Sequence, residues 1–515
     1  MRIFAPHAVD FYKTGHHRML PAGTEHIYSN LTPRADGMAR QLADTDHRMV
    51  FFGLQRFIAE FLIDQWNETF FRRPEAEVIE QLRRRIDGAI GPGSADVDGF
   101  RALHRLGYLP IRIKALPEGS RVPLRVPALT VVNTHPGFPW LTNYLESVLL
   151  ADLWKPCVNA SLAFEFRRML QRAAMRTVGD TGFVPFQGHD FSMRGMSGHV
   201  DAANSGVAHL TCFVGTDTVA AIDVAERFYG DHGGDQNSNG AEGERFGSAP
   251  KVIGVSVPAT EHMVMCIDGQ EHEFETYRRL IQDVHPRGLI SIVSDTWDYF
   301  QVLDDYTRRL REVILAREPD AAGFAKVVFR PDSGDPARII CGDPDAPENS
   351  PQRKGSAEIL WDIFGGTRTA KGYRLLHERV GLIYGDAITL ERAEAIIVGL
   401  EARGFASTNV VFGIGSFSYQ LVMRDSFGMA VKATWAQVDG AGRILMKDPR
   451  TAAGAKRSAA GLLRVEEENG SFVLHDRQTP EQERGGALRP VFEDGRLLVR
   501  DSLRTIRARL AAQLF

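Results

Sequence analysis

The segment RPDSGD (330–335) concentrates charged side chains in a stretch short enough for them to share one ligand. Arg330 supplies a fixed cation that clamps or stacks on a planar or anionic group. Asp332 and Asp335 supply carboxylates that hold ribose hydroxyls or, through water, a magnesium ion. An arginine–aspartate pair that caps the following helix explains the same residues. The segment alone leaves both roles open.

Two glycine-containing turns have the composition of phosphate sites. Gly385-Asp386 and GIGS (413–416) each follow an expected strand and precede an expected helix, where backbone N–H groups and the helix dipole favour an anion. A tight turn that requires glycine accounts for either one taken alone. The chain contains no GxxxxGK[ST] and no GxGxxG, so the common nucleotide-binding fingerprints are absent.

Asp217 and His262 also follow expected strands. Asp217 opens a predicted helix over 219–228, so helix capping by Thr216 or Asp217 is the first interpretation. His262 follows Glu261, and a histidine beside an acid can act as a general base, a metal ligand or a nucleophile, although a lone histidine is usually only a hydrogen-bonded partner. Direct metal ligation is not expected, because neither HxxxH nor HExxH spacing relates His262, His272 and His285.

These residues share one structural context, because each follows a short apolar run of strand type and precedes a helical pattern. Strands that alternate with helices pair in parallel, and near-continuous apolar runs indicate burial on both faces. We therefore expect a βα barrel or a doubly wound sheet with its polar groups gathered at one rim. The six runs are 209–214, 252–257, 289–293, 325–329, 380–384 and 409–412.

The two ends of the chain have a mixed α/β pattern. Apolar residues at helical spacing predict a core helix over 50–62, and short strands are expected at 111–115 and 128–133. The chain ends in a predicted helix near 502–514. The stretch 231–248 is rich in Gly, Asn, Asp and Glu and is expected to be a mobile loop.

Composition restricts the class of protein. The chain has 515 residues, 43% of them apolar and 24% charged, and a net charge of −4, which does not favour a nucleic-acid partner. The four cysteines form no CxxC pair, so a reducing compartment is expected. The N-terminal residues lack the apolar core of a secretory signal, and no stretch of about twenty apolar residues occurs. We expect a cytoplasmic protein with no membrane partner.

Taken in order, the segments resemble the nicotinamide phosphoribosyltransferases over most of the chain. The resemblance implies a type II phosphoribosyltransferase fold, an irregular α/β barrel at 161–420 flanked by an α/β sandwich made from 1–160 and 421–515. It also implies a head-to-tail homodimer whose active sites lie at the subunit interface. Its main motifs are DFYKTGHHRMLPAGTEHIYS (10–29), HDFSMRGMS (189–197), GTDTVA (215–220), SVPATEH (256–262), SIVSDTWD (291–298), RPDSGDP (330–336), IYGD (383–386), FGIGS (412–416) and KDP (447–449).

The implied reaction moves a phosphoribosyl group from 5-phosphoribosyl diphosphate to nicotinamide, which gives nicotinamide mononucleotide and diphosphate in NAD salvage. In the resemblance, the nicotinamide ring lies between Phe191 and the partner subunit's Tyr12, because stacking holds a flat ring with few polar groups. Asp217 accepts the carboxamide N–H and repels nicotinate. The full implied substrate-binding set is Asp10, Tyr12, Phe191, Arg194, Asp217, Ser291, Arg330, Gly385, Asp386, Gly413 and Gly415.

The resemblance also assigns catalytic roles. His262 matches the histidine that ATP phosphorylates, Asp295 is expected to orient it, and Asp332 is expected to hold ribose hydroxyls. Mg²⁺ accompanies the diphosphate, ATP is a co-substrate, and the glycine loop binds the 5′-phosphate. The diphosphate and ATP channel is implied to contain Arg34, Arg424, Lys432, Lys447 and Lys456.

Three alternatives share some of these residues. A nicotinate phosphoribosyltransferase of the same fold is disfavoured by Asp217, whose carboxylate would face that of the substrate. A catalytically silent relative is disfavoured because Arg330, Asp332, His262 and the glycine loop are all present. A βα-barrel metal hydrolase is disfavoured by the lack of ligand-spaced histidines.

Overall fold

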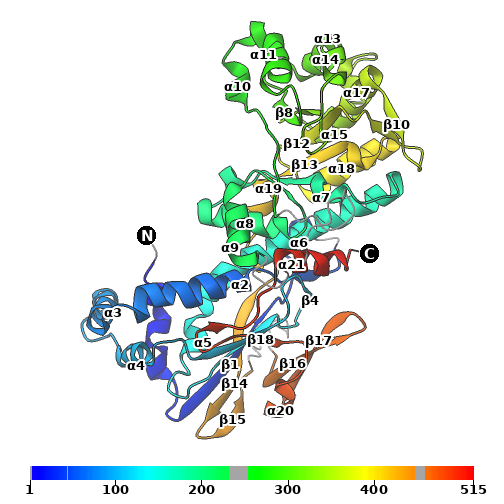
Figure 1. Cartoon of the computed structure of the whole chain (residues 1–515). Coiled ribbons are helices and arrows are strands. Elements are labelled where there is room, and N and C mark those ends of the chain that lie inside the picture. Colours follow the sequence, from blue (N-terminus) through cyan, green and yellow to red (C-terminus); the bar gives the residue numbers. More distant parts are fainter. Residues whose placement is uncertain (1–2, 43–44, 231–252, 447–458, 515) are drawn as a thin grey trace. The chain divides into compact units, whose positions relative to one another are not determined.

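The computed structural model describes residues 3–42, 45–230, 253–446 and 459–514 (Figure 1). The chain forms two units. The first contains Met1–Ser161, Ala225–Gly234 and Val422–Leu510, and the second contains Leu162–Val224, Asp235–Leu421 and Ala511–Phe515. The expected loop at 231–248, together with Lys447 and Lys456, lies outside the described residues.

The second unit is built on a six-stranded sheet with the order β7-β6-β13-β12-β9-β8, in which every pairing is parallel. Strands β8 and β12 contain Val and Ile and are buried along their whole length. This is typical of parallel strands that are covered on both faces. The strands are β6 (Gly188–Asp190), β7 (Gly215–Thr216), β8 (Ile290–Val293), β9 (Val327–Arg330), β12 (Val380–Tyr384) and β13 (Val410–Ile414).

The segment 255–260 joins the two edge strands of this sheet. Val255 forms a parallel bridge with Gly215 of β7, and Ala259 forms one with Ser291 of β8. The backbone N–H of Val255 donates to the carbonyl of Val214 at 2.8 Å, and that of Ser291 donates to the carbonyl of Pro258 at 2.9 Å. The sheet thereby closes on itself. The predicted irregular βα barrel is confirmed. Of the run predicted at 252–257, Val252 lies outside the described residues, and the rest takes part through the single bridge at Val255 instead of a regular strand.

Of the remaining predicted runs, four form β8, β9, β12 and β13, but the strand predicted at 209–214 is wrong. Residues up to Leu210 end helix α8 (His199–Leu210), and pairing begins at Gly215. His209 is fully buried there, with its ring nitrogens 2.7 Å from the hydroxyl of Tyr419 and 3.0 Å from the carbonyl oxygen of Gly215. A short apolar run inside a core does not distinguish a buried helix from a strand.

Helices cover the barrel and begin at identifiable caps. The Thr389 side chain accepts the backbone N–H of Arg392 at the start of α18, whose apolar residues turn inward. Asp335 caps α15 in the same way, with Pro336 as the first helical residue. The longer helices are α8 (His199–Leu210), α9 (Val219–Tyr229), α11 (Glu273–Arg279), α17 (Ser356–Phe364), α18 (Leu390–Ala402) and α6 (Glu146–Thr177), which begins in the first unit. The shorter include α10 (His262–Cys266), α15 (Pro336–Cys341), α16 (Pro351–Lys354) and α19 (Ser416–Tyr419).

The first unit contains a seven-stranded antiparallel sheet with the order β15-β14-β1-β5-β3-β18-β19. Both ends of the chain contribute strands, which confirms the expectation of an additional sheet built from both chain ends. The predicted strands 111–115 and 128–133 are β3 and β5. The members are β1 (Thr24–Thr32), β3 (Ile111–Ala115), β5 (Leu129–Asn133), β14 (Ala430–Val438), β15 (Ala441–Ile444), β18 (Arg489–Glu493) and β19 (Arg496–Leu497).

The first unit's helices differ from expectation at one boundary. The helix predicted over 50–62 starts later, at Leu54, because Val50 belongs to β2 (Arg48–Val50), and Gly53 turns the chain at φ 103°. The C-terminal helix is confirmed as α21 (Leu503–Ala511). The other elements include α3 (Glu75–Ile90), α4 (Asp98–Leu106), α5 (Leu141–Tyr144), β4 (Arg121–Pro123), β16 (Leu462–Glu468) and β17 (Ser471–Gln478). Among the described helices, none combines the length and apolar character needed to span a bilayer.

A substitution at Gly188 of β6 tests the packing of the barrel core. A Cβ at this position would lie 2.7 Å from ring atoms of Phe213, which is completely buried. Gly188→Ala should therefore lower the free energy of unfolding by about 1–3 kcal/mol through overpacking, measured by thermal or urea unfolding. Gly37→Ala is the matched control, since no atom lies within 4 Å of its added Cβ. Equal unfolding midpoints for the two variants would contradict this account of the core.

Candidate active site

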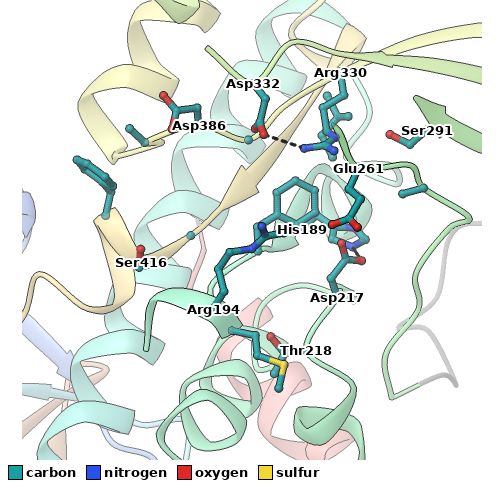
Figure 2. Close-up of a pocket in the computed structure, with 18 of the residues that line it drawn as sticks. His189, Arg194, Asp217, Thr218, Glu261, Ser291, Arg330, Asp332, Asp386 and Ser416 are labelled. Carbon is teal, nitrogen blue, oxygen red and sulfur yellow. Dashed lines mark hydrogen bonds and ion pairs between the residues drawn. The ribbon is translucent and has the colours of Figure 1, made fainter. Parts of the chain in front are cut away.

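A cavity of about 1050 Å³ opens at the carboxyl ends of the barrel strands (Figure 2). Residues at or just after the ends of β6, β7, β9, β12 and β13 contribute to the lining, as do Ser291 within β8 and the closing segment. All of the lining residues belong to the second unit. This is the rim at which βα barrels place their chemistry. The predicted residues that line the cavity are Phe191, Arg194, Asp217, Ser291, Arg330, Asp332, Gly385, Asp386 and Gly415.

The ring of Phe191 forms a flat part of the cavity wall. A Cβ on Gly413 would lie 2.3 Å from Cδ2 of this ring, and one on Gly385 would lie 2.8 Å away, so one side of the ring packs directly on two strand-end backbones. The cation of Arg330 lies 5.9 Å from the ring centroid. Such a ring offers a stacking surface to a planar heteroaromatic ligand.

Gly413 and Gly415, the two glycines of GIGS (413–416), have different surroundings. Gly413 lies inside β13 beneath the Phe191 ring and is not part of the cavity lining. Gly415 and Ser416 do line the cavity, at the start of α19. The structure therefore gives Gly413 a packing role, because no side chain fits under the ring, and leaves Gly415 as the glycine of this turn that faces a ligand.

Asp217 presents a carboxylate with a defined orientation. Its Oδ1 lies 2.8 Å from Nε2 of His189 and accepts the hydroxyl of Ser256 at 2.6 Å, so Oδ2 remains available to a ligand. Burial raises the pKa of the Asp217 carboxyl, but the hydrogen bonds from His189 and Ser256 and the charge of Arg330 outweigh it and set the pKa below its ordinary value. The carboxylate is therefore ionised at neutral pH, and His189 is the donor.

The helix-capping interpretation of Asp217 is wrong, because its hydrogen bonds among the described residues go to His189 and Ser256 and not to the first turn of α9. Thr216, the other capping candidate, accepts the backbone N–H of Thr218 just before the helix. His189, in contrast, was not singled out from the sequence. Its signal was present in HDF (189–191), since alternate residues of a strand share a face and His189 stands two residues before Phe191. The two rings lie edge to face, 5.2 Å apart between centroids.

Arg330 and Asp332 form an ion pair across the cavity wall. Nη1 of Arg330 lies 3.3 Å from Oδ2 of Asp332, and Nη2 donates to the carbonyl of Thr260 at 2.9 Å (Figure 2). Burial raises the pKa of Asp332, opposed by Arg330 and reinforced by the charges of Asp295 and Asp386. This concentration of carboxylates favours a cation. Among the described residues, no group of three or more His, Cys, Asp or Glu is placed to ligate a metal directly.

His262 is the first residue of α10 and stands outside the cavity lining, next to Glu261, which is part of it. Its Nε2 lies 3.3 Å from Oδ1 of Asp295. The imidazole is 47% exposed, whereas Asp295 is 8% exposed. The histidine is thus accessible to a ligand from solvent while a buried carboxylate sits against one of its nitrogens.

The other predicted binding residues belong to the first unit, with two exceptions that are not described. Tyr12 is 63% exposed, and Asp10 beside it accepts the hydroxyl of Ser147. Arg34 donates through Nε to the carbonyl of Gly428 at 2.8 Å, and Arg424 pairs with Asp425. Lys432 lies on β14 and is partly buried. Lys447 and Lys456 fall outside the described residues.

Known proteins resemble the chain over nearly its whole length. The model of the "Nicotinate phosphoribosyltransferase (NAPRTase) family" matches residues 186–495. The nicotinamide phosphoribosyltransferase of Acinetobacter baylyi is 56% identical over 513 residues, which cover 100% of this chain and 98% of that protein. The enzyme of that name from Xanthomonas campestris pv. campestris is 31% identical over 507 residues, or 97% of this chain and 96% of that protein.

Solved structures show the same fold at low sequence identity. A nicotinate-nucleotide pyrophosphorylase from Pyrococcus furiosus superposes with a TM-score of 0.54 at 13% identity and covers 99% of this chain and 95% of its own. Human nicotinic acid phosphoribosyltransferase gives a TM-score of 0.51 at 15% identity, with 98% and 93% covered. With the family match and the full-length similarity to curated relatives, the chain belongs to the nicotinate phosphoribosyltransferase family and is a pentosyltransferase.

Proposed function

We propose that the enzyme transfers the phosphoribosyl group of 5-phosphoribosyl diphosphate to nicotinamide, forming nicotinamide mononucleotide and diphosphate for NAD salvage. The observation that carries this choice is the ionised Asp217, with Oδ2 available beside the Phe191 ring. A carboxylate accepts the N–H of a carboxamide, whereas it repels the carboxylate of nicotinate. The names of the relatives support the same substrate.

The transfer itself is a displacement at C1 of the ribose. The pyridine nitrogen forms a bond to C1 as the C1–O bond to diphosphate breaks, and the diphosphate leaves with the electron pair. A loose, oxocarbenium-like transition state needs positioning and charge neutralisation more than covalent help. In this proposal Phe191 holds the ring, Asp332 and Asp386 hold the ribose hydroxyls, and Arg194 and Arg330 face the phosphates.

The carboxylates of the cavity also fit a magnesium ion that accompanies the diphosphate. Asp332 and Asp386 act on each other electrostatically, and the raised pKa of Asp332, caused by burial and by neighbouring carboxylates, reflects an excess of negative charge that a cation would relieve. These two residues would hold Mg²⁺ through water. When bound, Mg²⁺ supplies neutralisation of the charge that develops on the leaving diphosphate.

ATP coupling is the second part of the proposal and depends on His262. The ring nitrogen that does not face Asp295 attacks the γ-phosphorus of ATP, a P–N bond forms, and the P–O bond to the leaving ADP breaks. The proton on the other nitrogen stays directed at the Asp295 carboxylate, which balances the charge gained by the ring. Support comes from the exposure of His262 and from its 3.3 Å approach to a buried acid.

A shared active site in a homodimer completes the proposal. Phe191 packs on glycine backbones on one side and lines the cavity, which leaves room for a second aromatic ring over the substrate. Tyr12 of the partner subunit would supply that ring, since it is largely exposed in its own subunit. Arg34, Arg424, Lys432, Lys447 and Lys456 would attract the diphosphate and ATP phosphates.

Asp217→Asn and Asp217→Ser test the substrate choice. Both changes remove the repulsion of nicotinate and weaken the carboxamide hydrogen bond, so kcat/KM for nicotinamide should fall while that for nicotinate stays level or rises. The ratio should narrow by about 10- to 100-fold or more. The assay supplies phosphoribosyl diphosphate and Mg²⁺ with either base, with and without ATP, and quantifies the mononucleotide.

Asp223→Asn is the matched control, because Asp223 is exposed on α9, the helix that follows Asp217, and is not part of the cavity lining. This variant should keep the wild-type preference. Equal losses for both bases in the Asp217 variants would mean that Asp217 does not select the substrate, and a wild-type enzyme that uses nicotinate as well as nicotinamide would favour the nicotinate alternative.

His262→Ala tests the ATP step. The variant should lose ATP hydrolysis and the stimulation of synthesis by ATP, yet retain slow ATP-independent formation of mononucleotide, because the displacement needs no nucleophilic side chain. His272→Ala, which changes an exposed histidine in the same region, should behave as wild type in both assays. Normal ATP coupling in His262→Ala would rule out a phosphohistidine at this position.

Hybrid dimers test the shared site. Tyr12→Ala and Arg330→Ala should each be inactive as homodimers, since each removes a group from every site. When the two variants are dissociated, mixed and reassociated, part of the activity should return, because a hybrid dimer carries one site with both residues intact. A stable and fully active monomer, detected by size-exclusion chromatography with light scattering, would exclude the shared site.

A further inference from the structure

The turn that carries Asp332 also contains Ser333 and Asp335, and the three side chains have different hydrogen-bond or ion-pair partners. Asp332 pairs with Arg330 at 3.3 Å and lines the cavity, and Asp335 caps α15 by accepting the N–H of Arg338. Between them, the hydroxyl of Ser333 donates to Oδ2 of Asp295 at 2.5 Å. The turn therefore touches both the cavity and the acid behind His262.

The side chain of Tyr384, on the neighbouring strand β12, fixes the backbone of this turn. The hydroxyl of Tyr384, the last residue of β12, lies 3.1 Å from the carbonyl oxygen of Ser333 and 2.9 Å from that of Gly334. Gly334 has φ 86°, and a Cβ there would lie 2.7 Å from Ile339, so glycine is required. Because backbone and cap are both fixed, the Ser333 hydroxyl has a defined position.

Asp295 is held by its two neighbours through different oxygens. Oδ2 accepts from Ser333, which turns Oδ1 toward Nε2 of His262. Charge-assisted bonds of this kind orient a carboxylate strongly, and a nearly buried carboxylate that loses one donor takes up a different orientation. The position of the imidazole is thus linked, through one carboxylate, to the residue next to Asp332.

We propose that Ser333 is a positioning residue for the phosphorylation of His262, and that it links this step to the phosphoribosyl side of the cavity. The inference rests on the ATP step proposed above and adds a residue and a route to it. Ser333 fixes the carboxylate of Asp295, and Asp295 keeps one imidazole nitrogen occupied so that the other faces ATP. Occupation of the site at Asp332 acts on the same turn, so phosphoribosyl diphosphate modulates the reactivity of His262.

A hydrogen bond from Arg330 also connects the cavity to the segment before His262, but Arg330 is less suitable than Ser333 for a test. Nη2 of Arg330 donates to the carbonyl of Thr260, two residues before His262. Arg330 lines the cavity, so its replacement changes substrate binding together with any effect on the histidine. Ser333 is not part of the cavity lining, and its removal separates the two effects.

Ser333→Ala, Ser333→Thr and Ser350→Ala form the test set. Ser350 is the control, because its hydroxyl caps the short helix α16 in the same unit and does not contact Asp295. The initial rate of transfer of labelled γ-phosphate from ATP to the protein is measured with and without phosphoribosyl diphosphate. The KM for phosphoribosyl diphosphate is measured separately in the ATP-free synthesis assay, and thermal unfolding verifies that each variant is folded.

Ser333→Ala should lower the rate of protein phosphorylation by about tenfold or more, as expected for the loss of a hydrogen bond to a charged group. The effect of phosphoribosyl diphosphate on that rate should shrink as well. The KM in the ATP-free assay should remain within about twofold of the wild-type value, and Ser333→Thr should restore phosphorylation, because it returns the hydroxyl.

The outcomes separate this inference from the function on which it rests. Wild-type phosphorylation rates in Ser333→Ala, or a loss that Ser333→Thr does not restore, would overturn the role of Ser333 alone. A wild-type enzyme that makes nicotinamide mononucleotide but never carries phosphate would overturn the histidine step, and the role of Ser333 with it. A parallel rise in KM in the ATP-free assay would show that Ser333 acts on substrate binding and would overturn the proposed link.

Discussion

The packing of the Phe191 ring on bare strand-end backbone is the constraint on which the rest of the site depends. A Cβ on Gly413 or Gly385 would clash with the ring, so both positions must be glycine for the Phe191 ring, which follows β6, to lie against the backbone of β13 and of the residue after β12. The same approach places Asp386, which follows Gly385, and Asp217, which follows β7, around one cavity. A stacking surface and its polar surroundings therefore arise from one packing requirement.

Charge is distributed unevenly around the Phe191 ring. The environment of Asp217 differs from that of Asp332, so the two carboxylates suit different parts of a ligand. On one side Asp217 is held ionised by His189 and Ser256, with its pKa below the ordinary value despite burial. On the other side burial and neighbouring carboxylates raise the pKa of Asp332, although Arg330 opposes this. A neutral polar group suits the first environment, whereas cations and ribose hydroxyls suit the second. The polarity of the cavity thus follows the polarity of the proposed substrates.

The sequence predicts the barrel well because its strands carry their own signal. The apolar runs that become β9, β12 and β13 are followed by polar residues that line the cavity, and β8 contributes Ser291 from within the strand, so strand and site are encoded together. The signal fails for β6, which is three residues long and includes His189 and Asp190, and for residues 209–214, where the burial of His209 by tertiary contacts favours a helix. The packing role of Gly413 depends on a ring more than two hundred residues away, and no local pattern contains it.

The two hydrogen bonds to Oδ1 of Asp217 explain why the proposed selectivity for nicotinamide over nicotinate need not depend on a deeply buried charge. The side chain is 45% exposed, and an exposed carboxylate that rotates freely interacts weakly with a ligand. Two donors on Oδ1 remove that freedom and direct the remaining acceptor at one position, so the interaction strengthens without the desolvation cost of full burial. His189 also contacts the edge of Phe191, which ties the orientation of the acceptor to the plane in which the substrate ring stacks. In the proposed function, one connected set of side chains therefore contacts both the amide group and the ring of the substrate, and a change in either His189 or Phe191 would alter both contacts together.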